Sequence, residues 1–544
     1  MEKRKTIYYE FWKIAGSTQE LKKTGTRIVG DNSITTGIDT IPTATLTIPL
    51  EDLPAEEIAN GKEPRMALYT VKIFYQVDKI TKYTFVGTID TMNVDYANYT
   101  VSMNLSHQVA RMREWVMPAG YVVKNTTLSH VVGENGADLG YSSTMGPETQ
   151  TYEARVNFEF RDEESLPGVK VKDTPIECSF SSTNKLEALN EALNNTESVH
   201  FMVDLSKEDT IVLGSFGDLT DVLVSPTPFY EEECNDKDMS KYVTMLTEPS
   251  YNVNYTNHFN RAVVFCGDVA EQVMHMTLKE VYENKDMQIE GFPVGIYNNE
   301  INLSQETEWD TDNTNSEKVY NTRKINNEKV YKEFETVAYA NNDNREYYVT
   351  DQEQLDKDQV IKHTVFNFSD LYPIPELEKT PEGEEEAVEY AITDEDRKAI
   401  VQRAYWRAIR KLKSQRPERV WQFNSTPLPY MFQDGQKVTL FFVKKVINRD
   451  DDRTNEKDKT IVKVQDEFYL TKRTITFDDD LNEINTLTLD VELRPRDISD
   501  AEWELTELAK KSSGGIGGPN YPSELSGSSS GDSSHGTVGY NPSY

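Results

Sequence analysis

Two blocks of alternating apolar and polar residues, one near each end of the chain, constrain the fold most. The first block covers residues 43–50, 69–75, 83–90 and 99–105, and the second covers residues 436–442, 468–476 and 486–493. A period of two residues is typical of strands that bury one face and leave the other in solvent. The sequence therefore predicts a β-meander or a small barrel near each end.

The two blocks also resemble each other. In each block an aromatic segment, residues 85–90 or 468–473, leads through a polar turn to an alternating segment, residues 101–105 or 487–491. One interpretation is an internal two-fold β-module, and the other is chance similarity between alternating strands.

A chain of 544 residues is too long for one hydrophobic core. We predict a multidomain, β-rich α+β fold in which two tube-like β-barrels flank α/β and mixed domains. The expected parts are a first tube-like β-barrel (1–120), an inserted α/β domain (121–230), a mixed β domain with acidic loops and a terminal helix (231–415), a second β-barrel segment completed by strands from 240–270 (416–497), and a flexible Ser/Gly-rich tail (498–544).

Helical periodicity is confined to a few segments. A short helical link is expected at residues 53–58, where Pro54 suits a first helical turn. Residues 185–193 follow a capping-type start and place three leucines on one stripe. The clearest helix runs from Asp394 to about Lys413 behind Thr393. Its predicted apolar stripe is Ile400, Ala404, Ala408 and Leu412.

The charge of the chain argues against nucleic-acid binding. The 92 acidic and 58 basic side chains give a net charge of −34. Tight binding to phosphate backbones is therefore not expected. The charge has two interpretations: simple solubility, or a field that keeps passing DNA from adhering.

Cysteine usage and hydropathy indicate where the chain folds. The three cysteines, Cys178, Cys234 and Cys266, are odd in number and widely spaced. They support neither a disulfide framework nor a four-thiolate zinc site, which favours a reducing, intracellular place of folding. The N-terminus lacks the features of a signal peptide, and no apolar stretch approaches the ~18 residues of a membrane span.

No pattern predicts catalytic, cofactor-binding or metal-binding residues. His258 and His275 lack a carboxylate or cysteine repeat and are expected to be ordinary polar residues. Asp450–Asp452 and Asp478–Asp480 are expected in turns, where Asp bonds to its own backbone. Adventitious cation binding is the alternative for these two runs, although neither has the glycine and glutamate of a helix–loop–helix calcium site.

An aromatic-rich region around residue 330 has two interpretations. Interleaved tyrosines and asparagines there could form an exposed carbohydrate-binding surface, or they could mark strand faces and subunit contacts, which we favour. The tyrosines are Tyr320, Tyr331, Tyr339, Tyr347 and Tyr348.

The succession of these elements resembles the hub proteins of tailed-phage tails and baseplates. The resemblance is carried by residues 85–90 with Trp115, by the helix at 185–193, and by a helix that precedes residues 432–438 and the strands 468–470 and 487–489. Many relatives carry a C-terminal peptidase or wall-cleaving domain. This sequence departs from that pattern after Leu493, so we expect no such activity.

The resemblance implies a homotrimer without cofactors, in which each chain contributes two tube-like barrels. Six modules would then match a six-fold tail tube above and a three-fold tip below. The implied partners are a tail tube or distal tail ring protein, a tape measure protein, and a tip or receptor-binding protein. DNA would pass an acidic channel without specific binding, in a virion tail assembled in the host cytoplasm. The alternatives are a carbohydrate-active or wall-degrading tail enzyme, and a receptor-binding adhesin.

Overall fold

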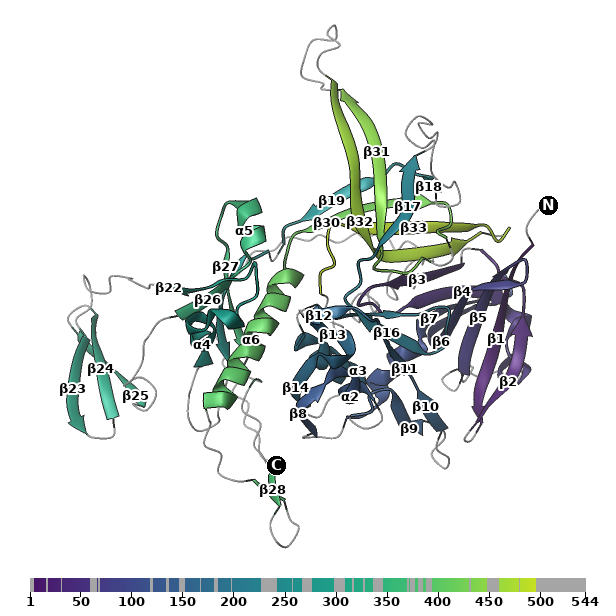
Figure 1. Ribbon diagram of the computed structural model, residues 1–544. Helices are drawn as coiled ribbons and strands as arrows, with labels where there is room; N and C mark the ends of the chain where they lie inside the picture. Colours follow the sequence, from purple (N-terminus) through teal and green to yellow (C-terminus); the bar gives the residue numbers. More distant parts are fainter. Residues whose placement is uncertain are drawn as a thin grey trace, which may run out of the picture.

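The architecture is organised around one large β-sheet that contains strands from both ends of the chain. The computed structural model describes residues 4–226, 242–266, 276–297, 309–335, 346–371, 377–379, 385–387, 394–447 and 459–495, apart from short gaps at 16–17, 31, 59–65, 67–68, 118–120, 134–136, 146–151, 167, 181–183, 197, 257, 316–317, 326–327, 369–370, 430–431 and 479. The main sheet has 14 strands. Four further groups of elements pack beside it or extend from it (Figure 1). The predicted multidomain, β-rich fold is confirmed.

The N-terminal module is an open half-barrel. Its strands are β1 (Lys5–Ala15), β2 (Thr18–Gly25), β3 (Asn32–Gly37), β4 (Thr43–Pro49), β5 (Tyr69–Val77), β6 (Ile80–Asp95) and β7 (Thr100–His107). Each predicted alternating segment forms one of these strands. The short helices η1 (Leu50–Asp52) and α1 (Ala55–Ile58) follow β4, and α1 lies within the helical link predicted at residues 53–58. Alternate side chains, such as Leu46, Phe85 and Met103, point into an apolar core that water does not reach.

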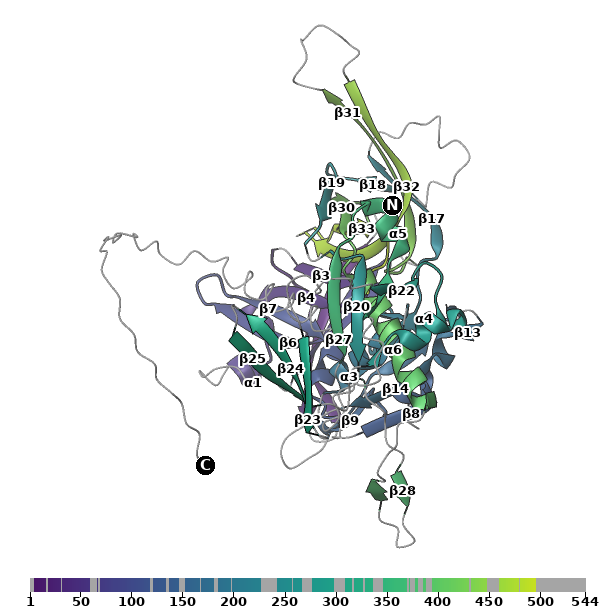
Figure 2. The same ribbon diagram turned by 90° about the vertical axis from the view of Figure 1, so that its left-hand side faces the viewer.

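The second β-module is a closed barrel of six strands. Its members are β17 (Leu219–Pro226), β18 (Tyr242–Met245), β30 (Glu418–Ser425), β31 (Lys437–Ile447), β32 (Lys459–Phe477) and β33 (Glu483–Asp490). Parallel pairing of β17 with both β18 and β31 closes the ring. A further strand, β19 (Ser250–Asn254), pairs with β30 outside the ring. The far ends of β31 and β32 project from the barrel (Figures 1 and 2).

The partition of residues between parts differs in detail from the sequence-based one. β17 falls within the range predicted for the inserted domain but belongs to the closed barrel. β18 and β19, from the range 240–270, lie on the barrel sheet, whereas β20 (Arg261–Cys266) belongs to a different sheet. Alternation identifies strands, but it does not identify the sheet that each strand joins.

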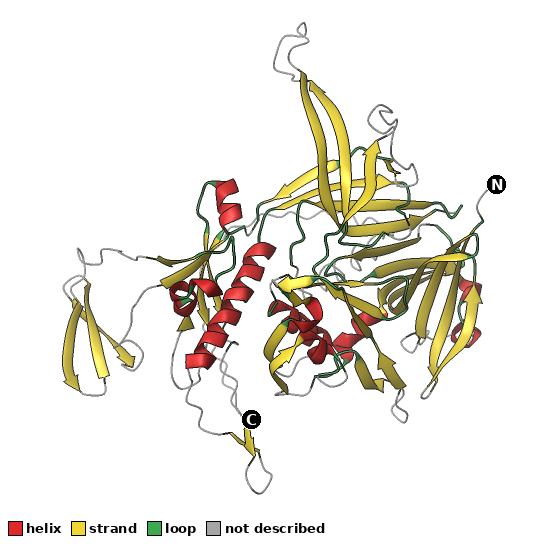
Figure 3. Cartoon of the chain, in the orientation of Figure 1, coloured by secondary structure: helices red, strands yellow, loops and turns green. Residues whose placement is uncertain are grey.

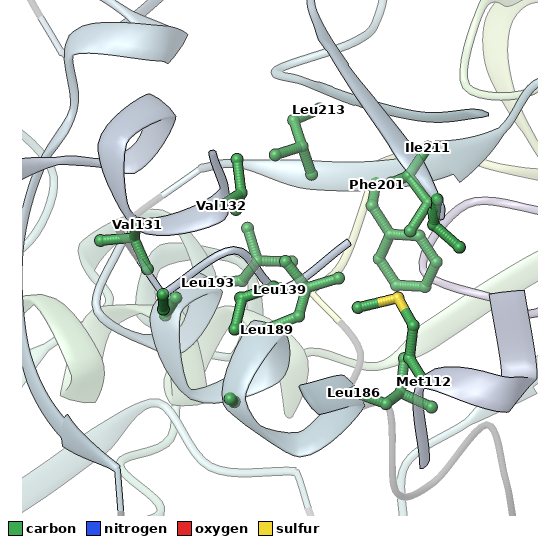
Figure 4. Close-up of a cluster of buried hydrophobic side chains, with 14 of the residues drawn as sticks. Met112, Val131, Val132, Leu139, Leu186, Leu189, Leu193, Phe201, Ile211 and Leu213 are labelled. Atoms are coloured by element: carbon green, nitrogen blue, oxygen red, sulfur yellow. The ribbon is translucent and has the colours of Figure 1, made fainter. Parts of the chain in front are cut away.

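The inserted domain lies between the two β-modules in the sequence. Its elements are η3 (Gln108–Glu114), β8 (Tyr121–Thr127), α2 (Leu128–Val132), β9 (Tyr141–Met145), β10 (Tyr152–Arg155), β11 (Asn157–Phe160), β12 (Glu164–Leu166), β13 (Val169–Lys170), η4 (Val171–Asp173), β14 (Pro175–Phe180), α3 (Lys185–Asn194), β15 (His200–Val203) and β16 (Thr210–Gly214). The predicted helix is α3, and a capping box formed by Asn184 and Glu187 starts it. Its leucines enter a core shared with α2, η3 and the strands (Figure 4).

The mixed domain is inserted between β19 and β30. Its described elements are β20, β21 (Met276–Thr277), α4 (Lys279–Glu283), η7 (Lys285–Met287), β22 (Val294–Tyr297), β26 (Glu346–Thr350), α5 (Gln352–Asp358), β27 (His363–Phe368) and α6 (Asp394–Ser414). The predicted terminal helix is α6, and its predicted stripe of Ile400, Ala404, Ala408 and Leu412 is fully buried against the sheet. Figure 3 shows that most helical structure belongs to this domain and the inserted domain.

Two small strand groups complete the described fold. β23 (Trp309–Asn315), β24 (Lys318–Ile325) and β25 (Glu328–Glu335) form an antiparallel meander. β28 (Leu377–Lys379) and β29 (Glu385–Ala387) form a short hairpin where we expected an acidic loop.

Candidate assembly interface

The two β-modules have the same strand order. In the half-barrel the order is β3–β4–β7–β6–β5–β1, and in the second module it is β19–β30–β33–β32–β31–β17. These strands also occur in the same order along the chain, with the mixed domain inserted between β19 and β30. The modules differ in one pairing, because β1 is antiparallel to β5 whereas β17 is parallel to β31.

Each module also has one long middle strand that changes partner halfway. β6 pairs first with β5 and then with β7, and β32 pairs first with β31 and then with β33. In both strands an irregularity in the ladder to the last partner marks this change, at Asp90 in β6 and at Thr471 in β32. A bulge bends a strand and increases its twist. Shared order and a shared bulge agree with the internal two-fold β-module, which is one of the two interpretations of the sequence.

The modules are joined edge to edge through β3 and β32. Six residue pairs, from Asn32 with Phe477 to Gly37 with Lys472, form an antiparallel ladder. On the core side the rings of Tyr75 and Phe477 lie 4.6 Å apart. The hydroxyl of Tyr83 donates a 2.9 Å hydrogen bond to Glu483 across the same joint. The two modules are therefore parts of one continuous sheet.

The outer face of this sheet carries hydroxyl and amide side chains. We call this set the hydroxyl face, and its members are Ser33, Thr35, Thr43, Thr45, Thr47, Thr91, Asn93, Ser102, Asn104, Gln422, Asn424, Thr474, Thr476, Thr486 and Thr488. All are half-buried or exposed, and none carries a charge. Lys472 and Asp95 lie at its margins.

Hydrogen bonds between strands connect members of the hydroxyl face. The hydroxyls of Thr35 and Thr474 are 3.0 Å apart across the joint between modules. Thr47 and Ser102 are bonded at 2.9 Å, and the amide of Asn104 donates a 2.8 Å bond to Thr91. Such pairs stabilise a sheet by about 0.2–1 kcal/mol each. In so acidic a chain, an uncharged face of this extent is a surface suited to contact without ionic adhesion.

A buried contact fixes the inserted domain against the half-barrel. Asp39, in the turn after β3, is fully buried and accepts a 2.6 Å hydrogen bond from Nδ1 of His200 and a 2.9 Å bond from the backbone N–H of Phe201. Arg410 of α6 lies nearby and donates to the backbone carbonyl of Val199 at 2.9 Å. Burial alone would raise the pKa of Asp39, but His200, Arg410 and the Phe201 amide outweigh it and hold that pKa below its usual value.

A second buried cluster holds the mixed domain against the closed barrel. Arg416 lies between α6 and β30, and its side chain is 8% exposed. It donates to both oxygens of Asp351 at 2.6 and 2.9 Å and to Glu492 at 2.5 Å. Bidentate pairing of this kind fixes direction as well as distance. The cluster therefore sets the angle between the two parts.

The histidine and aspartate predictions have separate outcomes. Nδ1 of His258 lies 3.1 Å from the carbonyl of Gln415, and its Nε2 contacts Asp358. Both ring nitrogens of this buried histidine thus have a protein neighbour, which fits a structural role. Asp478 forms a turn in which its Oδ1 accepts from the backbone N–H groups of Asp480 and Asn482, as predicted. His275 and Asp450–Asp452 lie outside the described residues.

The expected tyrosine surface is only partly described, and one of its members is misplaced. Tyr347 is 2% exposed in the core of the mixed domain, so the prediction that it is exposed was wrong. Tyr348 is half-buried, and the guanidinium of Arg261 lies 4.2 Å from its ring centre. The side chains of Tyr320 and Tyr331, and all of Tyr339, lie outside what the structure describes.

The described residues contain neither a metal-ligand cluster nor a membrane-spanning helix. Within them, no group of three or more His, Cys, Asp or Glu side chains could hold a metal ion. No helix of this part of the chain is both long and apolar enough to span a membrane. Cys266 is a free, buried thiol, and burial raises its pKa to about 12, which makes it unreactive. Cys234 and the side chain of Cys178 are not among the described atoms.

Comparisons with known proteins return solved structures only. No family model and no curated protein matches the sequence. The tail protein from Neisseria meningitidis is similar at 8% identity, with 89% of this chain and 96% of that chain covered and a TM-score of 0.40. The 43 kDa tail protein of prophage MuSo2 from Shewanella oneidensis is similar at 9% identity, with 90% and 99% covered and a TM-score of 0.41.

A third similar structure comes from a secretion system. It is an Escherichia coli component of the type VI secretion system that is described as structurally similar to phage T4 tail proteins. It has 8% identity, 87% of this chain and 77% of that chain covered, and a TM-score of 0.30. The structures similar to this chain are thus tail proteins and tail-like secretion components, at low identity and modest TM-score.

Proposed function

We propose that the chain is a structural hub of a phage tail tip or baseplate. In this proposal it forms a homotrimer that adapts a six-fold tail tube to three-fold distal tip and host-recognition proteins. The observation that carries the proposal is the β3–β32 joint, because it places two modules of like strand order in one sheet. Three such chains would present six similar modules around one axis.

The proposed partners follow from the two ends of such a ring. A tail tube or distal ring protein and the tape measure protein would lie on the six-fold side, and a tip or receptor-binding protein on the other. DNA would cross the centre without specific binding. The net charge of −34 supports passage without adhesion, since it repels a polyanion at long range. Assembly in the host cytoplasm and residence in the virion tail belong to the same proposal.

The experiment that tests the proposal is a native mass measurement of the purified full chain over a range of concentrations. A mass of three chains is the expected result, and a tail particle should contain the chain at half the stoichiometry of one tube ring. A chain that stays monomeric at every concentration and is absent from tail particles would overturn the proposal. Incubation of the chain with cell-wall polysaccharide tests the enzyme alternative, and cleavage by the native chain would replace the structural role.

A further inference from the structure

In the joint between the two modules, one edge of β32 is paired with β3. β31 pairs with β32 as far as Tyr469, and β3 takes over the same edge of β32 from Lys472 to Phe477. The edge that β3 occupies therefore begins just beyond the bulge at Thr471. A strand edge left unpaired presents a row of free N–H and C=O groups.

The corresponding edge of the half-barrel has no partner strand among the described residues. β5 pairs with β6 only as far as Thr88, and the edge beyond the bulge at Asp90, residues 91–95, has no ladder partner on that side within the described part. Aligning the two bulges places Thr91 at the position of Lys472 and Asp95 at that of Thr476.

The turns that follow these edges are similar in kind, although the aspartate of the second turn lies two positions beyond the one that the bulge alignment gives. Asp95 accepts from the backbone N–H groups of Ala97 and Asn98 and from the side chain of Asn98. Asp478 makes the same kinds of bond with Asp480 and Asn482. A residue with positive φ lies near the end of each turn, Tyr99 at 54° just after Asn98 and Leu481 at 59° just before Asn482. Residues of this size rarely adopt that conformation, so the two turns share an uncommon feature.

The strand that corresponds to β3 in the second module is β19. β3 pairs with the first half of β4, and β19 pairs with the first half of β30. Tracing the registers through β7 and β33 places Ser250, Asn252 and Asn254 at the positions of Ser33, Thr35 and Gly37. The outer edge of β19, like that of β6, has no partner strand in the described part of the chain.

We propose that β19 of one copy pairs antiparallel with the free edge of β6 in the next copy and so repeats the β3–β32 joint between chains. This inference rests on the proposed trimer and specifies its interface. The repeated register places Ser250 opposite Asp95, Asn252 opposite Asn93, and Asn254 opposite Thr91 of the next copy.

The side chains at this register are complementary on both faces over residues 250–253, whereas Asn254 takes the position that Gly37 has in the joint within the chain. The three pairs just given are polar and extend the hydroxyl face. On the other face, Tyr251 lies opposite Val94 and Val253 opposite Met92, as Ile34 lies opposite Ile475 in the joint within the chain. Tyr251 is 48% exposed in the single chain, and this pairing would cover it. A slip of one residue would set polar against apolar side chains on both faces.

The pairing also determines which face of the ring surrounds the central channel. Each copy contributes an arc of eight strands, namely β6, β7, β4, β3, β32, β33, β30 and β19. The apolar faces of this arc bury cores with β1, β5, β17 and β31, which must therefore lie outside the ring. The hydroxyl face, on the opposite side of the arc, would therefore line the central channel. The wall that we predicted to be acidic would instead be a mostly uncharged polar surface with Asp95 and Lys472 at its margins.

Disulfide trapping tests the register directly. Asn252→Cys and Asn93→Cys are combined in one full-length chain, oxidised, and separated under denaturing, non-reducing conditions. Opposed residues of antiparallel strands have Cα atoms about 4.5–5.5 Å apart, which suits a disulfide. Chain-to-chain products up to a covalent trimer should exceed those of each single variant by at least about tenfold.

A matched control moves the second cysteine to the opposite face of β6. In Asn252→Cys with Met92→Cys the second thiol points to the opposite side of the sheet, so trapping should fall to the level of the single variants. A native trimer that gives no excess trapping for the Asn252/Asn93 pair, or equal trapping for the control, would overturn the interface and leave the hub proposal standing. A chain that is monomeric in its native state would overturn both the interface and the hub proposal.

Discussion

Asp39 and His200 are bonded at 2.6 Å across the boundary between the half-barrel and the inserted domain, and both side chains are buried. The bond joins a turn of the main sheet to β15, and Arg410 brings α6 of the mixed domain to the same place. Elements of three parts of the chain thus converge on one carboxylate.

Replacing Asp39 by Asn should destabilise this convergence by about 3 kcal/mol, because the nearby Arg410 loses its buried counter-charge. Hydrogen exchange should increase in β15 and in the turn after β3 before it increases in β4. The exposed Asp173→Asn is the control and should leave exchange unchanged. Equal protection from hydrogen exchange in both variants would show that Asp39 does not hold these elements together.

Gly37 is the last residue of β3, and a Cβ atom there would lie 2.6 Å from the carbonyl oxygen of Thr471. Gly37→Ala must therefore push β3 away from β32, at a cost of about 1–3 kcal/mol. We expect a lower midpoint of unfolding and faster proteolysis between the modules. Ser33→Ala, in the same strand but without a clash, should behave like the native chain. A Gly37→Ala variant of native stability would contradict the tight joint.

Burial, reinforced by Glu208, raises the pKa of Asp209 to about 7, and its Oδ1 has no hydrogen-bond partner within the described residues. A carboxyl with a raised folded pKa stabilises the fold below its unfolded pKa and loses that contribution as pH rises toward the folded value. Relative to Asp209→Asn, the native chain should lose up to about 4 kcal/mol of unfolding free energy between pH 4 and pH 8.

Urea unfolding of the native chain and of Asp209→Asn at a series of pH values measures this difference. The nearby cations Lys72 and Arg111 lower the pKa of Asp209, but burial raises it by more. Parallel stability curves for the two proteins would show that Asp209 titrates normally.

Arg416→Met should loosen the mixed domain from the closed barrel. The substitution keeps much of the apolar stem but leaves Asp351 and Glu492 without their shared cation, which costs about 3–5 kcal/mol. Limited proteolysis should then cut near residues 255–260 and 414–417 earlier than in the native chain. Arg419→Ala, on the neighbouring strand, is the matched control, and equal cleavage of both variants would argue against the cluster.

Positive charge on the hydroxyl face should create adhesion to DNA. Thr47→Lys with Ser102→Lys places two ammonium groups side by side on this face, because the native hydroxyls are 2.9 Å apart. We expect retention of duplex DNA by the purified trimer to rise by about tenfold at low salt and to disappear at high salt. Thr18→Lys with Thr24→Lys on exposed β2 carries the same charge and should not match that gain.

Local patterns predicted the elements of this fold well. The strands of both blocks, the capped helix α3 and the buried stripe of α6 follow from periods of two or 3.6 residues and from capping chemistry. The shared strand order of the two modules was also anticipated by their similar segments. The strands, the capped helix and the buried stripe each depend on neighbours in sequence.

The features that the sequence did not reveal depend on residues far apart in it. Closure of the barrel requires β17 to pair in parallel with β18 and β31, and nothing in 219–226 specifies those partners. Asp39 resembles any turn aspartate until His200 is brought to it. Tyr347 lies among asparagines and acidic residues, which suggested exposure, yet it faces the α6 side of its sheet. The alternating threonines at 43–47, 474–476 and 486–488 were the available signal for the hydroxyl face.

The joint of β3 with β32 can form only after almost the whole chain has been synthesised. β3 leaves the ribosome early, but its partner residues, from Lys472 onward, are made only near the end of the chain. At about 5–20 residues per second, the edge of β3 stays unpaired for on the order of half a minute. An open edge invites pairing with the same edge of another nascent chain. Slower translation between β4 and β32 should therefore lower the yield of soluble protein even though the finished fold is unchanged.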